Sequence, residues 1–175
     1  MQDKTSSKEL LVGEWIRRAE DDELNIRSIL KHRDGTAGVV CFMSHQMAEK
    51  YLKAYLVFKK NRFPKIHPLE KIVELCEEID HSFMDMKEPA ADLNPFYTPS
   101  RYPGDYPDFN WKDAERAYDL ATKIKEFVLF KIQQTKSQRG FTLLGLIIAV
   151  SIIALFAGGG LYVREWKERQ STLQI

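Results

Sequence analysis

The stretch from Gly140 to Val163 contains no charged residue, and it constrains the fold of this chain more than any other feature. At about 1.5 Å of rise per residue, a helix over this stretch crosses a hydrocarbon core of roughly 30 Å. A soluble protein would have to enclose such a helix on all sides, and a chain of 175 residues is too short for that. The sequence therefore predicts one transmembrane helix over 140–163.

The basic residues around this stretch predict its orientation. More of them precede it than follow it, namely Lys123, Lys125, Lys131, Lys136 and Arg139 against Arg164, Lys167 and Arg169. The flank richer in Lys and Arg tends to remain in the cytoplasm, and the polar N-terminus carries no apolar signal region. We therefore expect a single-pass membrane protein with a cytoplasmic N-terminal domain and a short charged tail, 164–175, outside.

Apolar residues recur at helical spacing in four segments before the uncharged stretch. These segments are 7–31, 39–60, a third that begins near Pro68, and 111–134. The segment from Pro89 to Pro107 contains too many prolines for a long helix. The predicted fold class is all-α, with an antiparallel bundle of four main helices over 1–135, a basic linker over 136–139 and the transmembrane helix.

Two pairs of polar residues predict where helices begin. Ser6 with Glu9 has the spacing of a capping box before the first helix. Asn110 is a good N-cap for the last helix, with Asp113 three residues further on.

Charge and metal-ligand spacing exclude some classes of function. The whole chain has 26 basic and 25 acidic residues, and the part before Gly140 is evenly balanced, which argues weakly against a general nucleic-acid surface. No C-x-x-C occurs, and His32, His45, His67 and His81 do not have metal-ligand spacing. We therefore expect no metal site and no cofactor.

Four polar residues of the second segment form a pattern of their own. Gln46, Glu49, Lys50 and Lys53 are three or four residues apart, so they share one face of an otherwise apolar helix. Two interpretations stay open: a solvated face with a Glu49–Lys53 pair, or a polar groove or dimer surface.

Four motifs in the same order resemble those of the HEPN family. They are Trp15-Ile-Arg-Arg-Ala-Glu-Asp-Asp, Ser44-His-Gln-Met-Ala-Glu-Lys-Tyr-Leu-Lys-Ala-Tyr-Leu, His67-Pro-Leu and Ser100-Arg-Tyr-Pro-Gly. The resemblance covers about 8–132 and implies a helical bundle that commonly forms a homodimer. Some HEPN proteins cut RNA as toxins, and others bind nucleotides or pair with a minimal nucleotidyltransferase in toxin–antitoxin systems.

The RNase motif of this family is incomplete here. Nucleolytic members use Arg-x(4–6)-His, in which the imidazole moves a proton near neutral pH. Arg101 matches the arginine, but no histidine follows His81, so we assign no catalytic residue and do not expect an enzyme.

Two interpretations of Arg101 stay open: a phosphate or nucleotide contact, which suits its guanidinium fork, or a capping or loop-stabilising contact. Tyr97, Tyr102 and Tyr106 beside it either stack a base or form apolar cover for the end of the bundle. The candidate nucleotide or phosphate-binding residues are therefore Arg101, Tyr102 and the polar face of Gln46, Glu49, Lys50 and Lys53.

The residues that lead into the uncharged stretch have a second resemblance. Lys136-Ser-Gln-Arg-Gly-Phe-Thr-Leu-Leu-Gly-Leu-Ile-Ile-Ala resembles the signal of type IV pilin-like proteins, which are cut after the glycine and methylated on the following phenylalanine. The equivalent positions are Gly140 and Phe141. Two features depart from the family, because Gly145 replaces its glutamate and the leader would be 140 residues long. A plain membrane anchor is the alternative.

Together these features predict a membrane-anchored HEPN domain that binds a nucleotide, RNA or a protein partner, with a minimal nucleotidyltransferase as the expected partner. Two other functions stay open. One is an RNase toxin with a degenerate motif, and the other is a pilin-like membrane component that carries a HEPN passenger.

Overall fold

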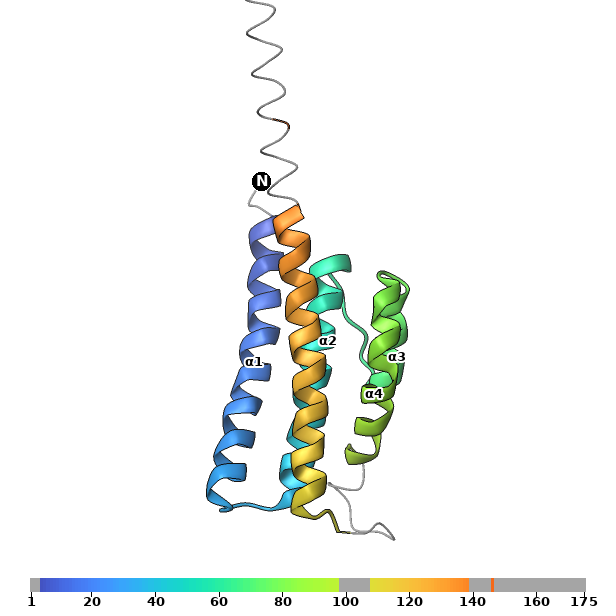
Figure 1. The fold of residues 1–175 in the computed structure, drawn as a ribbon. Coiled ribbons are helices and arrows are strands. Elements are labelled where there is room, and N and C mark those ends of the chain that lie inside the picture. Colours follow the sequence, from blue (N-terminus) through green and yellow to red (C-terminus); the bar gives the residue numbers. More distant parts are fainter. Residues whose placement is uncertain (1–3, 98–107, 139–145, 147–175) are drawn as a thin grey trace, which may run out of the picture. The chain divides into compact units, whose positions relative to one another are not determined.

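The computed structural model of the chain describes residues 4–97, 108–138 and 146 (Figure 1). The chain divides into two compact units, Met1–Ile132 and Gln133–Ile175. Within the second unit, only 133–138 and 146 are described, and all are helical. No helix in the described part of the chain is long and apolar enough to cross a membrane. The predicted transmembrane helix over 140–163 lies outside the described residues except for Leu146.

The described residues form helices and no strand, which confirms the all-α prediction. The elements are α1 (Lys4–His32), α2 (Ala37–Lys60), α3 (Leu69–Glu77), the 3₁₀-helix η1 (His81–Met86), α4 (Lys87–Leu93), the 3₁₀-helix η2 (Asn94–Phe96) and a helix over 111–138. Three long helices therefore carry the bundle, and short elements take the fourth position beside α2 (Figure 1).

Contacts between the long helices fix their direction. Glu23 of α1 accepts hydrogen bonds from Lys125 at 2.6 Å and Tyr118 at 3.2 Å, and Arg33, which directly follows α1, pairs with Glu115 at 2.5 Å. As the chain runs from Glu23 to Arg33, the contacts in the last helix run back from Lys125 to Glu115, so the two helices are antiparallel.

The helix starts were predicted with mixed success. The Asn110 side chain accepts hydrogen bonds from the backbone N–H of Lys112 at 2.8 Å and of Asp113 at 3.2 Å, which confirms this cap. The cap predicted at Ser6 is wrong, because α1 begins at Lys4 and contains Ser6. A cap is worth only about 1 kcal/mol, so a helix can continue past a good capping residue.

α2 is the central helix of the bundle. Every residue from Tyr51 to Phe58 is buried, which is expected of a helix enclosed on all sides. Within the described residues, the buried polar or charged side chains are those of Ser44, His45, Glu49 and Lys53, and all four belong to α2. The central helix therefore places ionisable groups inside the bundle.

Candidate functional site

Glu49 and Lys53 form an ion pair inside the bundle. They lie one turn apart on α2, each is only 4% exposed, and Lys53 Nζ donates to Glu49 Oε1 at 2.7 Å. The Lys53 ammonium also lies 5.8 Å from the ring centre of Trp15 on α1, and Phe63 packs edge-to-face on that ring at 4.7 Å. The predicted pair is confirmed, but the solvated face is wrong, because α1 and the α2–α3 connection cover it.

His67 reaches the same carboxylate from the surface. It lies just before α3, its side chain is 52% exposed, and its Nδ1 is 3.2 and 3.3 Å from the two oxygens of Glu49. Gln46 Nε2 lies 3.4 Å from Glu49 Oε2 and adds a weak contact. Donation by Nδ1 leaves Nε2 of a neutral imidazole as a hydrogen-bond acceptor.

Tyr97 places an aromatic ring against both histidines. It stacks on His67 with ring centres 5.2 Å apart and planes 12° apart, and its ring centre lies 5.0 Å from that of His45. His45 is fully buried, and this burial, with His67 nearby, lowers the pKa of its imidazole to about 4. His45 is therefore neutral at pH 7 and acts as part of the aromatic wall.

Asn94 holds Tyr97 in place beside His67. Its Oδ1 accepts from the backbone N–H of Leu69 at 2.7 Å, and its Nδ2 donates to Glu70 Oε2 at 2.8 Å. These bonds join η2 to the first turn of α3. Since His67 precedes that turn and Tyr97 follows η2, the same joint positions both rings.

The predicted site residues separate into three groups. Gln46, Glu49 and Lys53 come together with His67, as described above. Lys50 instead pairs with Asp22 of α1; burial raises the pKa of the Asp22 carboxyl, and the Lys50 ammonium opposes that shift. Four residues, Arg101, Tyr102, Gly140 and Phe141, lie outside the described residues.

Sequence reasoning missed His45, His67, Asn94 and Tyr97 as members of one site. The signal for His67 was the His67-Pro-Leu motif, which reads only as a helix start when the fold is unknown. His45 stands in the second-helix motif and Tyr97 beside Arg101, whereas Asn94 had no local signal.

The arrangement suits binding better than catalysis. It offers a stacked pair of rings, of which His67 is exposed and Tyr97 is half-buried, together with the Nε2 nitrogen of His67 and a shielded carboxylate. Among residues 4–97 and 108–138, no group of three or more His, Cys, Asp or Glu is placed to hold a metal ion. A flat ligand with hydrogen-bonding edges has the right chemistry for this surface.

Comparisons with known proteins cover both parts of the chain. Residues 12–133 match the HEPN domain, and residues 135–161 match the prokaryotic N-terminal methylation motif. No match was found among curated proteins.

Two solved structures are similar to the first part. TT1696 from Thermus thermophilus is 29% identical, covers 69% of this chain and 97% of its own, and superposes with a TM-score of 0.60. ST0689, an archaeal HEPN homologue, is 30% identical over the same shares, with a TM-score of 0.55. Because the domain match spans most of the chain and these helical bundles agree with it, the chain belongs to the HEPN domain family.

Proposed function

We propose that this HEPN domain is a nucleotide-binding module whose binding surface is the stacked pair His67–Tyr97 above Glu49. The C-terminal segment would hold it at the cytoplasmic face of a membrane. The observation that carries the proposal is the buried Glu49–Lys53 ion pair, whose carboxylate contacts His67 of that stack.

The buried pair is a poor device for stability alone. Taking two charges out of water costs several kcal/mol per ion, and apolar residues of similar volume often stabilise a protein as well or better. The pair also meets His67, whose side chain is 52% exposed. The ion pair is therefore best explained by a role in ligand binding, in which Glu49 holds His67 in one tautomer and orientation.

The surface fits a nucleobase. A base can stack on an aromatic platform, and such stacking contributes roughly 1–3 kcal/mol. The Nε2 atom of His67 would accept a hydrogen bond from an exocyclic amine or a ribose hydroxyl. Lys53 is occupied by Glu49 and buried, so it supports the site from within and does not contact phosphate.

Phosphate contact is assigned to Arg101 and Tyr102, as the resemblance implies. A guanidinium fork suits phosphate oxygens better than an ammonium does. A homodimer and a minimal nucleotidyltransferase partner complete the proposal, and both rest on the family resemblance. Pull-down of the tagged chain from its native cells should recover such an enzyme, and recovery of none under crosslinking would remove this part.

ATP binding tests the proposed surface. We expect ATP to raise the melting temperature of the full chain, and Tyr97→Leu to weaken ATP binding about tenfold through loss of stacking. Tyr118→Leu removes a half-buried tyrosine on the last helix and should leave ATP binding unchanged. An unchanged melting temperature of the wild-type chain with ATP, or equal weakening by both variants, would contradict the proposal.

A second function is favoured by the methylation-motif match over 135–161. In this alternative the chain is a pilin-like membrane component with a HEPN passenger, cut between Gly140 and Phe141. Co-expression with a prepilin peptidase should then yield a fragment that starts at N-methylated Phe141, and Gly140→Val should abolish it. Mass spectrometry that finds only full-length chain would reject processing and leave an uncleaved anchor.

A further inference from the structure

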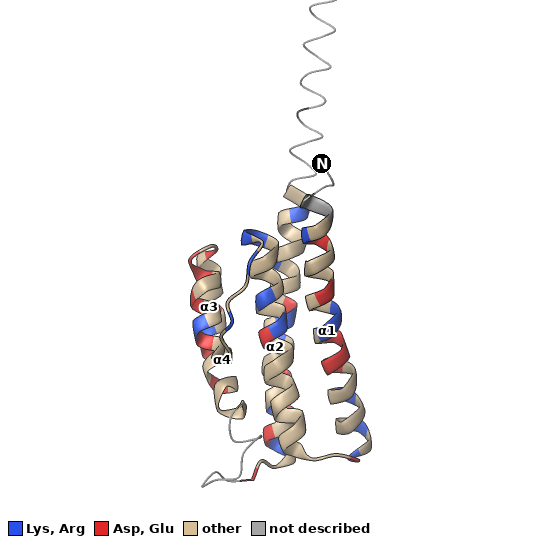
Figure 2. Cartoon of the chain, turned by 180° about the vertical axis from the view of Figure 1, so that it is seen from behind, with Lys and Arg blue, Asp and Glu red and all other residues tan. Residues whose placement is uncertain are grey.

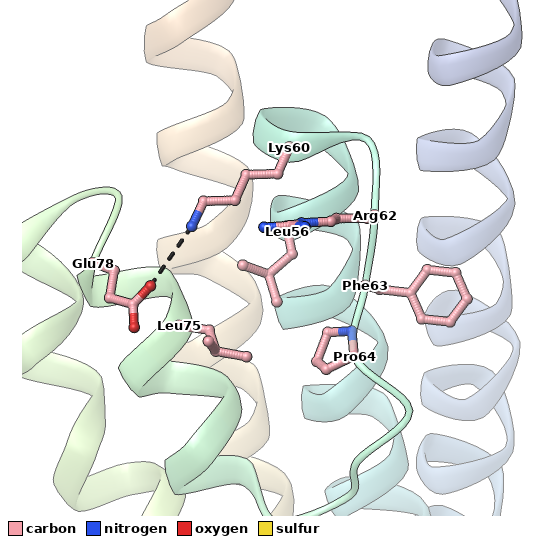
Figure 3. Close-up of a pocket in the computed structure, with 7 residues that line it drawn as sticks. All are labelled: Leu56, Lys60, Arg62, Phe63, Pro64, Leu75 and Glu78. Carbon is pink, nitrogen blue, oxygen red and sulfur yellow. Dashed lines mark ion pairs between the residues drawn. The ribbon is translucent and has the colours of Figure 1, made fainter.

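A pocket of about 260 Å³ opens between α2, the residues after it and α3. Figure 3 shows its lining, which is Leu56, Lys60, Arg62, Phe63, Pro64, Leu75 and Glu78. Apart from Phe63, which also packs on Trp15 beside the Glu49–Lys53 pair, none of these residues belongs to the candidate site described above. The pocket is therefore a separate feature of the bundle.

The shape of the chain after α2 builds this pocket. Asn61 ends α2 in the left-handed conformation, with φ 54° and ψ 29°, and its N–H donates to Val57 O at 2.9 Å. Asparagine tolerates this conformation better than most residues. The chain then turns back so that Pro64 forms one wall, while Phe63 points to α1 and packs on Trp15 (Figure 3). That contact holds the wall in place.

The pocket has an apolar floor and a basic rim. Leu56 and Leu75 supply the floor, beside the Pro64 wall. At the rim, Lys60 lies 3.7 Å from Glu78 in a largely exposed pair, which is worth little. Arg62 also lines the pocket, and none of the ion pairs found in the described part of the chain involves its guanidinium (Figure 3).

We infer that this pocket binds a small amphipathic carboxylate, such as a short acyl chain. The acyl body would cover Leu56 and Leu75, and the carboxylate would take two parallel hydrogen bonds from Arg62. Two cations against one carboxylate make the rim net positive, which selects an anion over an amine. The volume of about 260 Å³ leaves room for a short acyl chain such as that of hexanoate.

Fluorine NMR of trifluoromethyl-labelled hexanoate tests the pocket in the full chain. The full chain is placed in lipid nanodiscs, and empty nanodiscs serve as the blank. The signal should broaden with protein and recover when excess hexanoate is added. Acetate lacks the apolar body, hexanol lacks the charge and hexylammonium has the opposite charge, so each should compete at least tenfold less well.

Two variants separate the pocket from the general surface charge. Arg62→Gln should weaken hexanoate binding about tenfold, because a hydrogen bond to a charged group is lost. Lys65→Gln removes the same charge three residues away, outside the pocket, and should bind as the wild type does. No broadening with wild-type protein, equal competition by hexanol, or unchanged binding by Arg62→Gln would overturn the inference.

Discussion

Two sets of ion pairs in this protein join residues three or four apart on one helix, in opposite surroundings. On α1, Arg17 pairs with Glu14 at 3.2 Å and Asp21 at 3.1 Å, and all three side chains are more than half exposed. On α2, Glu49 and Lys53 pair at 2.7 Å with 5% of each side chain exposed. In Figure 2, red and blue residues lie along α1, and a red and blue group lies in the middle of α2.

The comparison shows that the exposed pairs of α1 and the buried pair of α2 have different energetic consequences. Exposed pairs contribute about 0–1 kcal/mol, because water and salt screen them. A buried pair has a large desolvation cost, and removal of one partner leaves an uncompensated charge inside the protein. The α1 set can therefore be changed freely, whereas the α2 pair must be kept or removed as a unit.

The largest expected effect is that of removing one buried partner. Glu49→Ala leaves the Lys53 ammonium buried without its carboxylate, so the free energy of unfolding should fall by about 3–5 kcal/mol. Urea unfolding of the wild type and the variant measures this loss. The control is Glu14→Ala on α1, which should change stability by less than about 1 kcal/mol. Similar losses in the two variants would remove the distinction between the two regions.

The second largest effect is expected to be a loss of stability in acid that is caused by the buried His45. Burial lowers the pKa of His45 from 6.5 to about 4, so between these values the unfolded chain binds a proton that the folded chain does not. Stability is thus intact above pH 6.5 and falls as pH drops toward 4, by about 3 kcal/mol from this group. His45→Phe should reduce this pH dependence, as measured by urea unfolding at pH 7 and 4.5. Equal pH dependence in both proteins would exclude His45 as its source.

Removal of the Asn94 side chain, which joins η2 to α3 beside the two rings, should lower the free energy of unfolding moderately. Asn94→Ala removes the acceptor for the Leu69 N–H and the donor to Glu70, so we expect a loss of about 1–2 kcal/mol. It should also weaken ATP binding, since Tyr97 would no longer be held against His67. Isothermal titration with ATP checks this, and unchanged affinity would show that the joint serves stability alone.

The smallest effect belongs to the exposed set. Arg17→Gln removes both α1 pairs at once, and the loss should be at most about 1 kcal/mol and disappear in high salt. Urea unfolding with and without added sodium chloride measures it. A loss comparable to that of Glu49→Ala would mean that burial is not what distinguishes the two sets.

Periodicity was enough to predict most helices but not their surroundings. Apolar spacing located the long helices, and local spacing also predicted the Asn110 cap and the Glu49–Lys53 pair. Burial of that pair depends on Trp15 and Phe63, which come from elements before and after α2. The sequence of α2 alone does not show which residues of other segments cover it. The polar face around Glu49 and Lys53 was therefore equally compatible with a solvated surface and with a covered one.

The rest of the site depends on contacts between distant segments. His67 meets Glu49 only because the connection after Asn61 turns back along α2. Tyr97 lies in a proline-rich region whose helices are too short for a periodic signal, and Asn94 joins it to α3. Sequence motifs indicated that some of these residues matter, whereas their meeting point required the fold.

The most direct test of the central claim replaces the buried pair as a unit. The claim is that Glu49 and Lys53 serve ligand binding and not stability. The double variant Glu49→Leu/Lys53→Met should unfold within about 1 kcal/mol of the wild type or at higher urea, and it should lose the ATP-induced rise in melting temperature. A double variant that keeps the full ATP response, or that is as unstable as Glu49→Ala, would contradict the claim.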